Sequence, residues 1–299
     1  MMRVGFPEPC RTCGCSSGRE CLVGGRPSYH TILLALGLMI ADGGCNGRDD
    51  PSGQSPVISP GPVPHQTPVT LSVLFIGNSL TYYNNLPNTV ASIAAAAGDD
   101  IRVGMVAEPK LSLMDHLQPD GTAEAAIRGG RWDFVVLQQG ATTDFASRDT
   151  LILAAERFDA IIRSVGARPA LYMVWPPADR PEGFCAARAA YQAAASAVGG
   201  AFLPVGSAWQ DALQRDASLP LYHPDGIHPA PLGTWLAAIT IYDNLTGHDG
   251  RRLAPRAVVN GGRLDLATAT VQLLQDVAYT ATSGAGSAEG CDTNQSDPR

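Results

Sequence analysis

The chain has 299 residues, of which 45% are hydrophobic and 16% are charged, and its formal net charge is -7. This composition is typical of a globular protein and excludes a largely disordered one. The negative net charge and the lack of a basic cluster argue against nucleic-acid partners, because phosphate binding needs concentrated positive charge.

The N-terminal segment, residues 1–45, holds four cysteines close together and then an apolar run. The cysteines at 10, 13, 15 and 21 resemble a zinc cluster, but they lack the second pair of a finger or ribbon. Residues 31–41 are apolar, follow Arg26 and precede small residues. That run is too short to span a bilayer and has the length of a signal-peptide core. We therefore predict an export leader in preference to a metal site.

Cys45 raises the question of how the exported protein is held. Gly44 suits the position before a lipid-modified cysteine, whereas Asp42 stands where a lipoprotein signal normally has Leu. Membrane attachment through lipidated Cys45 and simple secretion both stay open. Beyond the leader only Cys185 and Cys291 remain, and these two could pair in an oxidising compartment.

Three further regions follow the leader. Residues 46–69 are rich in Pro, Ser, Gly and Gln without apolar periodicity, which predicts a linker. Residues 70–282 alternate β-branched runs with longer helical stretches and predict a single domain. The Gly-rich and Ser-rich residues 283–299 predict a disordered tail.

The elements expected in the domain alternate between strands and helices. The strands are expected at Leu71–Ile76, Ile101–Val106, Phe134–Leu137, Ala170–Trp175 and Ala201–Pro204. The helices are expected at Leu86–Ala97, Ala123–Arg128, Asp149–Val165, Pro181–Ala197, Pro229–Leu245 and Leu264–Tyr279. Apolar strands separated by crossover helices predict an α/β domain with a parallel sheet covered on both faces.

A serine near the start of the domain and a histidine near its end indicate nucleophilic catalysis. Ser79 follows the first expected strand by two residues, at the sheet edge where ligands bind in open α/β folds. A serine hydroxyl needs a base, and the base needs an orienting group. His228 and Asp225, three residues apart, can fill these roles. The alternatives are that Ser79 merely caps a helix, and that His223 competes with His228.

These residues carry a family resemblance. Gly-Asn-Ser-Leu-Thr at 77–81 resembles the first block of the SGNH/GDSL hydrolase family, and Asp-Gly-Ile-His-Pro at 225–229, followed by Gly233, resembles its last block. Residues 82–87 also resemble one bacterial branch. The resemblance covers most of residues 71–245.

The family resemblance implies a three-layer, flavodoxin-like α/β/α fold with a five-stranded parallel sheet. It also implies ester hydrolysis through an acyl-enzyme, with Ser79 as nucleophile, His228 as base and Asp225 as orienter. No metal or cofactor is required, because the base activates the hydroxyl.

The same resemblance implies an oxyanion hole built from the nucleophile's N–H, a glycine N–H and an asparagine side chain. In the segment 109–116, Lys110 stands where the family has the glycine, and a Lys disfavours φ > 0. We therefore expect a reshaped loop or a shifted alignment. Gln138 and Gln139 follow the third strand in place of the asparagine. Strand alternation sends the two to opposite sides, so only one can face the site. We favour Gln138 as the donor, because it matches the Leu-Gln that follows this strand in the bacterial branch. Asn78 is a further candidate.

Two functions follow as expectations. The first is an exported serine esterase for a small acyl ester, with an acetylated carbohydrate as one candidate substrate by analogy. The second is a non-catalytic cell-surface binding module on the same fold. The sequence does not specify the oligomeric state. His116, Tyr82, Tyr83 and Trp175 could contact substrate or serve packing alone.

Overall fold

The computed structural model describes residues 66–118, 121–140, 145–284 and 291, all within one compact unit. The expected leader, with its cysteine cluster and Cys45, lies outside the described residues, as do most of the expected linker and tail. The export leader, lipidation and the zinc alternative therefore stay predictions.

Five parallel strands form the central sheet, in the order β2-β1-β3-β4-β5. They are β1 (Thr70–Gly77), β2 (Asp100–Ala107), β3 (Phe134–Leu137), β4 (Arg168–Tyr172) and β5 (Ala201–Leu203). This is the flavodoxin-like order, in which the chain reverses direction across the sheet next to β1. The prediction of a five-stranded parallel sheet is confirmed.

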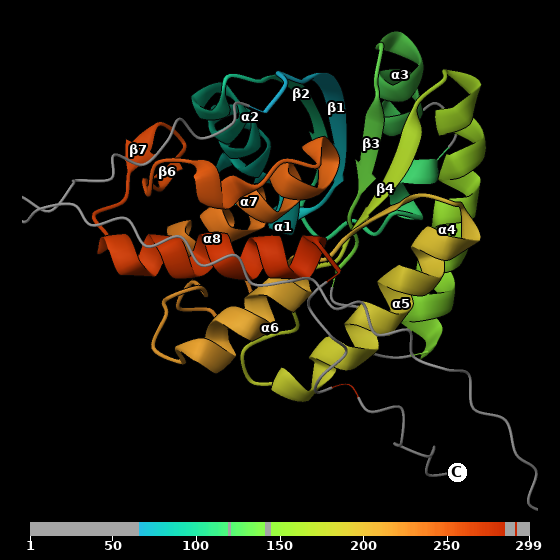
Figure 1. Cartoon of the computed structure of the whole chain (residues 1–299). Helices are drawn as coiled ribbons and strands as arrows, with labels where there is room; N and C mark the ends of the chain where they lie inside the picture. Colours follow the sequence, from blue (N-terminus) through green and yellow to red (C-terminus); the bar gives the residue numbers. More distant parts are fainter. Residues whose placement is uncertain (1–65, 119–120, 141–144, 285–290, 292–299) are drawn as a thin grey trace, which may run out of the picture. The chain divides into compact units, whose positions relative to one another are not determined.

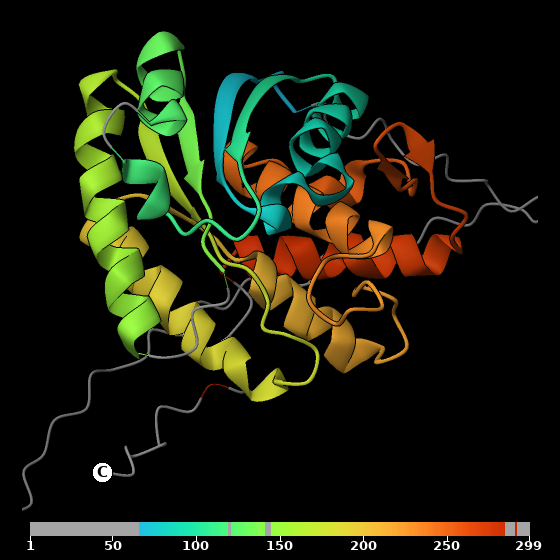
Figure 2. The same ribbon diagram turned by 180° about the vertical axis from the view of Figure 1, so that it is seen from behind.

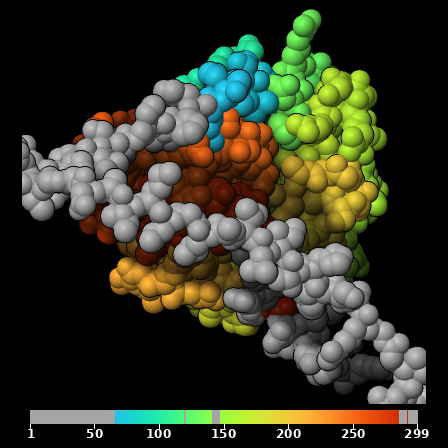
Figure 3. Space-filling view, viewed as in Figure 1, coloured from blue at the N-terminus to red at the C-terminus, as the bar shows by residue number. Residues whose placement is uncertain are grey.

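Helices cover both faces of the sheet, so the expected three-layer architecture is also confirmed. They are α1 (Ser79–Tyr82), α2 (Leu86–Ala97), α3 (Thr122–Gly129), α4 (Phe145–Ser164), α5 (Phe184–Ala197), α6 (Val205–Arg215), α7 (Pro231–Thr246) and α8 (Thr268–Thr282). Figures 1 and 2 show α3, α4 and α5 on one side of the sheet, and α2 and α7 on the other. In the space-filling view α8 lies between α7 and α6 (Figure 3).

Several regions differ from the expectations. The helix α6 was not predicted, although Val205, Ala208, Trp209 and Ala212 have helical spacing and are buried. The strand β4 lies nearer the N-terminus than expected, because its neighbours β3 and β5 end opposite Leu171 and Tyr172. A two-strand hairpin, β6 (Val258–Val259) and β7 (Gly262–Arg263), turns through an Asn-Gly pair with positive φ.

Tight packing fixes the start of α7 beneath the sheet edge. The rings of Trp175 and Trp209 stack with centroids 3.6 Å apart. Gly233 on α7 lies against this stack, since a Cβ built there would be 2.3 Å from the Leu221 carbonyl oxygen and from the Trp209 ring. Any side chain at position 233 would push α7 away, and with it the loop that carries His228.

A disulfide joins Cys185, near the start of α5, to Cys291. The pairing that the sequence left open is therefore present, and it closes a loop over 106 residues of sequence separation. Bonds over such long loops stabilise a fold by roughly 2–4 kcal/mol, in the chain-entropy account by restricting the unfolded chain.

No helix in the described ranges combines the length and the hydropathy needed to cross a membrane.

A buried acid lies on α7, away from the serine. Asp243 is 2% exposed, and neither of its carboxyl oxygens forms a hydrogen bond of ordinary geometry with the described residues, although the nearby Gly250 amide partly favours its ionised form. Burial raises the pKa of Asp243 well above its usual value, and the charge of Asp249 raises it further. The folded protein therefore holds a proton that the unfolded chain releases, so stability falls as pH rises from the unfolded pKa towards the folded one.

We expect Asp243→Asn to weaken this pH dependence. An amide carries no charge to desolvate, so the variant should exceed the wild type in free energy of unfolding by about 1 kcal/mol or more at about pH 8. At about pH 4 the two should be similar, because both side chains are then largely neutral. Urea unfolding across this pH range measures the difference, with Asp100→Asn, at an exposed aspartate on β2, as control. Equal pH slopes in wild type and Asp243→Asn would contradict the assignment.

Candidate active site

The turn after β1 presents the serine. Asn78 has an extended backbone, and its Oδ1 accepts a hydrogen bond of 3.1 Å from the Leu80 amide, so Asn78 caps α1. Ser79 is the first residue of the helix. The alternative that Ser79 itself caps the helix is therefore wrong, and its hydroxyl is not used for capping.

Ser79, His228 and Asp225 come together at the carboxyl edge of the sheet. The distance from Ser79 Oγ to His228 Nε2 is 2.9 Å, and that from His228 Nδ1 to Asp225 Oδ2 is 2.7 Å. Serine and histidine are 149 residues apart in sequence. With the Nδ1 proton on the carboxylate side, Nε2 is the acceptor for the serine proton, which is the order of groups that nucleophilic catalysis needs.

The loop around Asp225 keeps its carboxylate ionised. Oδ1 accepts hydrogen bonds of 2.9 Å from the amides of Ile227 and His228. The Ile227 amide is the largest cause that holds the pKa of Asp225 well below its usual range, and His228 lowers it further, while burial opposes both. An ionised carboxylate in this place can orient the imidazole and stabilise the imidazolium.

His223 contacts the acid and not the serine. Its Nδ1 lies 3.1 Å from Asp225 Oδ2, and its amide donates to the His228 carbonyl oxygen at 2.8 Å. Of the two histidines beside Asp225, the structure places His228 against Ser79. His223 thus belongs to the support of the loop.

Tyr83 and Asn84, which follow the serine turn, connect that turn to the loop that carries His228. The Tyr83 ring stacks on the His228 imidazole, with centroids 4.4 Å apart and an interplanar angle of 19°. Asn84 has φ of 51° and donates through Nδ2 to the Pro229 carbonyl oxygen and to Thr234 Oγ1, both at 2.9 Å. Sequence reasoning missed the role of Asn84. The one available signal was the resemblance of residues 82–87 to a branch of the family.

The segment after β2 carries Lys110 in a conformation that we expected a lysine to avoid. Lys110 has φ of +65°, the left-handed region that favours glycine. The lysine therefore adopts positive φ at the position where the resemblance places a glycine. The Asn78 Nδ2 donates to the Leu111 carbonyl oxygen at 3.1 Å and ties this loop to the serine turn. Within the described ranges, the N–H groups of Ser79 and Lys110 have no hydrogen-bond acceptor.

We expect Lys110→Gly to preserve turnover of an acetyl ester. The free energy of unfolding should stay unchanged or rise by up to about 1 kcal/mol, because the left-handed conformation is strained for lysine and not for glycine. Lys110→Pro removes the N–H and forces negative φ. It should lower kcat by about 10²–10³-fold if this amide is an oxyanion donor. Steady-state kinetics and thermal unfolding measure both, and equal activity of the Gly and Pro variants would exclude the donor role.

The side chains of Gln138 and Gln139 form hydrogen bonds within the protein. Gln138 is fully buried; its Oε1 accepts from the Asn78 amide and from Thr81 Oγ1, and its Nε2 donates to the Gln139 carbonyl oxygen. Gln139 is 8% exposed, and its Nε2 lies 3.3 Å from the Ser147 carbonyl oxygen. Gln138 does face the serine turn, as the family resemblance led us to expect, but its side-chain oxygen accepts hydrogen bonds from that turn. These contacts replace the oxyanion role expected for Gln138.

His116 connects the loop after β2 to the end of β1, next to the serine turn. It is buried, and its Nε2 lies 2.8 Å from the Gly77 carbonyl oxygen, so the loop after β2 is fastened to the end of β1. It fits neither a substrate contact nor a surface histidine. Across the described residues, no group of three or more His, Cys, Asp or Glu side chains is placed to hold a metal ion.

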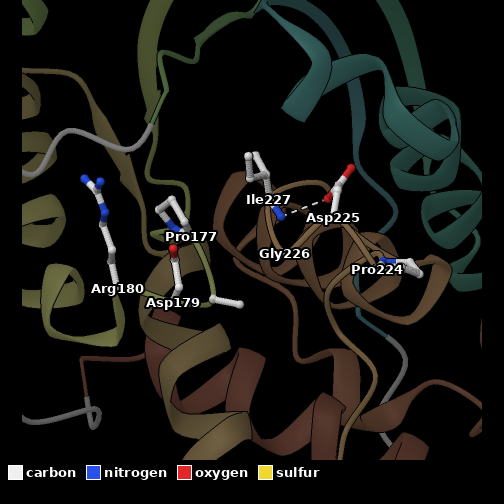
Figure 4. Close-up of a pocket in the computed structure, with 8 residues that line it drawn as sticks. Pro177, Asp179, Arg180, Pro224, Asp225, Gly226 and Ile227 are labelled. Carbon is white, nitrogen blue, oxygen red and sulfur yellow. Dashed lines mark hydrogen bonds between the residues drawn. The ribbon is translucent and has the colours of Figure 1, made fainter.

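A cleft of about 520 Å³ adjoins the acid. Residues 177–180, after β4, form one wall, and residues 224–227, from the loop of Asp225, form the other. Figure 4 shows Pro177, Asp179 and Arg180 on one side of this cleft and Ile227 on the other.

The comparisons with known proteins bear on the fold. Neither a protein-family model nor a curated protein matches the chain. A candidate SGNH hydrolase of known structure from Slackia heliotrinireducens is 24% identical, with a TM-score of 0.51; the match covers 59% of this chain and 99% of that one. This chain has the SGNH hydrolase fold.

A second solved structure, a DUF4886 family protein from Bacteroides uniformis, matches with a TM-score of 0.61 and 19% identity. That match covers 73% of this chain and 96% of the other. The resemblance read from residues 77–81 and 225–229 is thus confirmed for the fold. On the SGNH fold the carboxyl edge of the sheet is where Ser79, His228 and Asp225 meet.

Proposed function

We propose that the protein is a serine esterase that hydrolyses a small acyl ester through an acyl-enzyme on Ser79. The observation that carries this proposal is the hydrogen-bonded chain from Ser79 Oγ through His228 to Asp225, with distances of 2.9 and 2.7 Å. The proposal is also supported by the groups that hold the three side chains in place, namely Asn78, Tyr83 and the backbone amides that bind Asp225. Catalysis by a triad requires such preorganised geometry.

In the proposed reaction, Ser79 Oγ attacks the acyl carbon while His228 Nε2 takes the hydroxyl proton. The N–H groups of Ser79 and Lys110 donate to the oxyanion of the tetrahedral intermediate. The C–O bond to the alcohol then breaks, and His228 returns the proton to the leaving oxygen. A water molecule, deprotonated by His228, attacks the acyl-enzyme and releases the acid and the free serine.

The acyl group is proposed to be small, with acetyl as the first candidate, and the ester is proposed to be that of a carbohydrate or another small alcohol. The protein is proposed to act after export. The Cys185–Cys291 disulfide supports this location, because such bonds persist in oxidising compartments. Lipidation at Cys45 and release as a secreted protein are both compatible with it.

Labelling with a fluorophosphonate tests the catalytic serine. We expect stoichiometric modification at Ser79, located by peptide mass spectrometry, and none in Ser79→Ala. This reagent reacts with a serine only when a neighbouring base activates it. Folded wild-type protein that stays unlabelled would favour the alternative, a non-catalytic binding module.

A further inference from the structure

We propose that the cleft between residues 177–180 and 224–227 binds the alcohol half of the ester, and that this alcohol is a neutral saccharide. The inference rests on the proposed esterase function and names its substrate class. It assigns recognition to Asp179 and Arg180, two residues outside the triad.

The direction of proton transfer places the alcohol on this side. His228 Nε2 gives its proton to the leaving oxygen, so the alcohol must leave on the imidazole side, while the acyl oxygen turns to the amides of Ser79 and Lys110. The cleft begins at the three residues directly before His228. Among them Ile227 is 49% exposed, a high value for a large apolar side chain, and Figure 4 shows it across the cleft from Pro177.

The two walls are held together by hydrogen bonds, so the cleft is formed before substrate binds. The Ala178 amide donates to the Gly226 carbonyl oxygen at 2.8 Å. The Trp175 Nε1 donates to the Ile227 carbonyl oxygen at 3.0 Å, and the Tyr222 hydroxyl donates to the Pro176 carbonyl oxygen at 2.8 Å. A preformed site saves the ordering cost that a flexible loop would add to binding.

The lining matches a sugar ring with its hydroxyl groups. Its apolar members, which suit the C–H face of a pyranose, are Pro177, Ala178, Pro224 and Ile227. Asp179 and Arg180 add one acceptor and one cationic donor, and neither side chain forms an ion pair within the described part of the chain. A carboxylate accepts from one hydroxyl while a guanidinium donates to a neighbouring one.

The charges of the cleft favour a neutral ligand. The carboxylate oxygens of Asp225 are engaged by Ile227, His228 and His223, which leaves Asp179 and Arg180 as neighbouring groups of opposite charge. A charged alcohol would be attracted by one of these two and repelled by the other. A neutral polyol can use both charged groups without such repulsion.

Kinetics with two substrates test the proposal. 4-Nitrophenyl acetate has an alcohol too short to use the charged wall, whereas an acetylated, uncharged oligosaccharide can reach it. We expect Asp179→Ala and Arg180→Ala each to raise KM for the oligosaccharide about tenfold, the loss of roughly one hydrogen bond to a charged group. The kcat/KM for 4-nitrophenyl acetate should stay within about twofold, and so should both activities of the control Arg102→Ala, an exposed arginine on β2.

The outcomes separate this proposal from the esterase assignment. Equal losses on both substrates, unchanged oligosaccharide kinetics, or a preference of the wild type for an acetylated oligogalacturonide would overturn the saccharide site. A wild type that hydrolyses neither ester would overturn the esterase function. In that case calorimetry of the deacetylated oligosaccharide with Ser79→Ala, with and without the Asp179→Ala/Arg180→Ala pair, decides the binding site alone: equal heats exclude it.

Discussion

Ser79→Ala is expected to lower kcat for 4-nitrophenyl acetate by about 10⁴-fold or more, as removal of a triad nucleophile does in serine hydrolases. The alanine removes the atom that forms the acyl-enzyme, while the partly buried site loses a single oxygen. Its hydrogen bond to His228 Nε2 disappears, but the imidazole keeps its bond to Asp225 and its stack on Tyr83. Initial rates, with circular dichroism and thermal unfolding for the fold, measure the effect.

A matched control is Ser92→Ala, since Ser92 is an exposed helical serine whose hydroxyl bonds only to the Asn88 carbonyl oxygen. It should keep its kcat within about twofold, as surface substitutions do. Equal activity of Ser79→Ala and wild type would refute the nucleophile, whatever the labelling experiment showed.

Asp225→Asn should reduce kcat by about 10³–10⁴-fold with little change in fold. The amide oxygen of the asparagine can still accept the two hydrogen bonds that the backbone amides of Ile227 and His228 donate to Oδ1. The amide nitrogen then replaces Oδ2 and donates to His228 Nδ1, so that the imidazole proton moves to Nε2. The nitrogen that faces Ser79 becomes a donor and no longer serves as a base.

Two substitutions isolate this tautomer effect. Asp216→Asn changes a half-buried aspartate that also accepts a hydrogen bond from an amide two residues ahead, and it should leave kcat unchanged. His223→Gln removes the second contact to Asp225 Oδ2 and should cost less than about tenfold. If His223→Gln proved as damaging as Asp225→Asn, the assignment of His228 as the base would fail.

Much of the fold follows from the sequence because its signals are local. Short apolar runs predicted all five strands of the main sheet, and the helices between successive strands predicted their parallel pairing. The helix α6 was predictable too, since Val205, Ala208, Trp209 and Ala212 repeat at helical spacing. By contrast, the position of β4 depends on where β3 and β5 end, which its own residues do not encode.

The candidate site divides in the same way. Ser79, Asp225 and His228 were found because residue types and spacing carry their chemistry. The contacts of Gln138 and His116 were not predictable, because they depend on which buried backbone groups lack partners once the chain has folded. Lys110 was misjudged for a related reason: intrinsic backbone preference costs only about 1–2 kcal/mol, and the surrounding loop can override it.

The Asn84 side chain has a consequence for how activity emerges during folding. Its amide joins the serine turn, near the start of the domain, to Pro229 and Thr234 near its end. The serine and its base meet only when these distant segments dock, so a nascent chain that ends before residue 225 contains the nucleophile without its partners. Recovery of the proposed esterase turnover after dilution from denaturant would accordingly report this docking event, and ring-current shifts from Tyr83 on the His228 protons would report it spectroscopically.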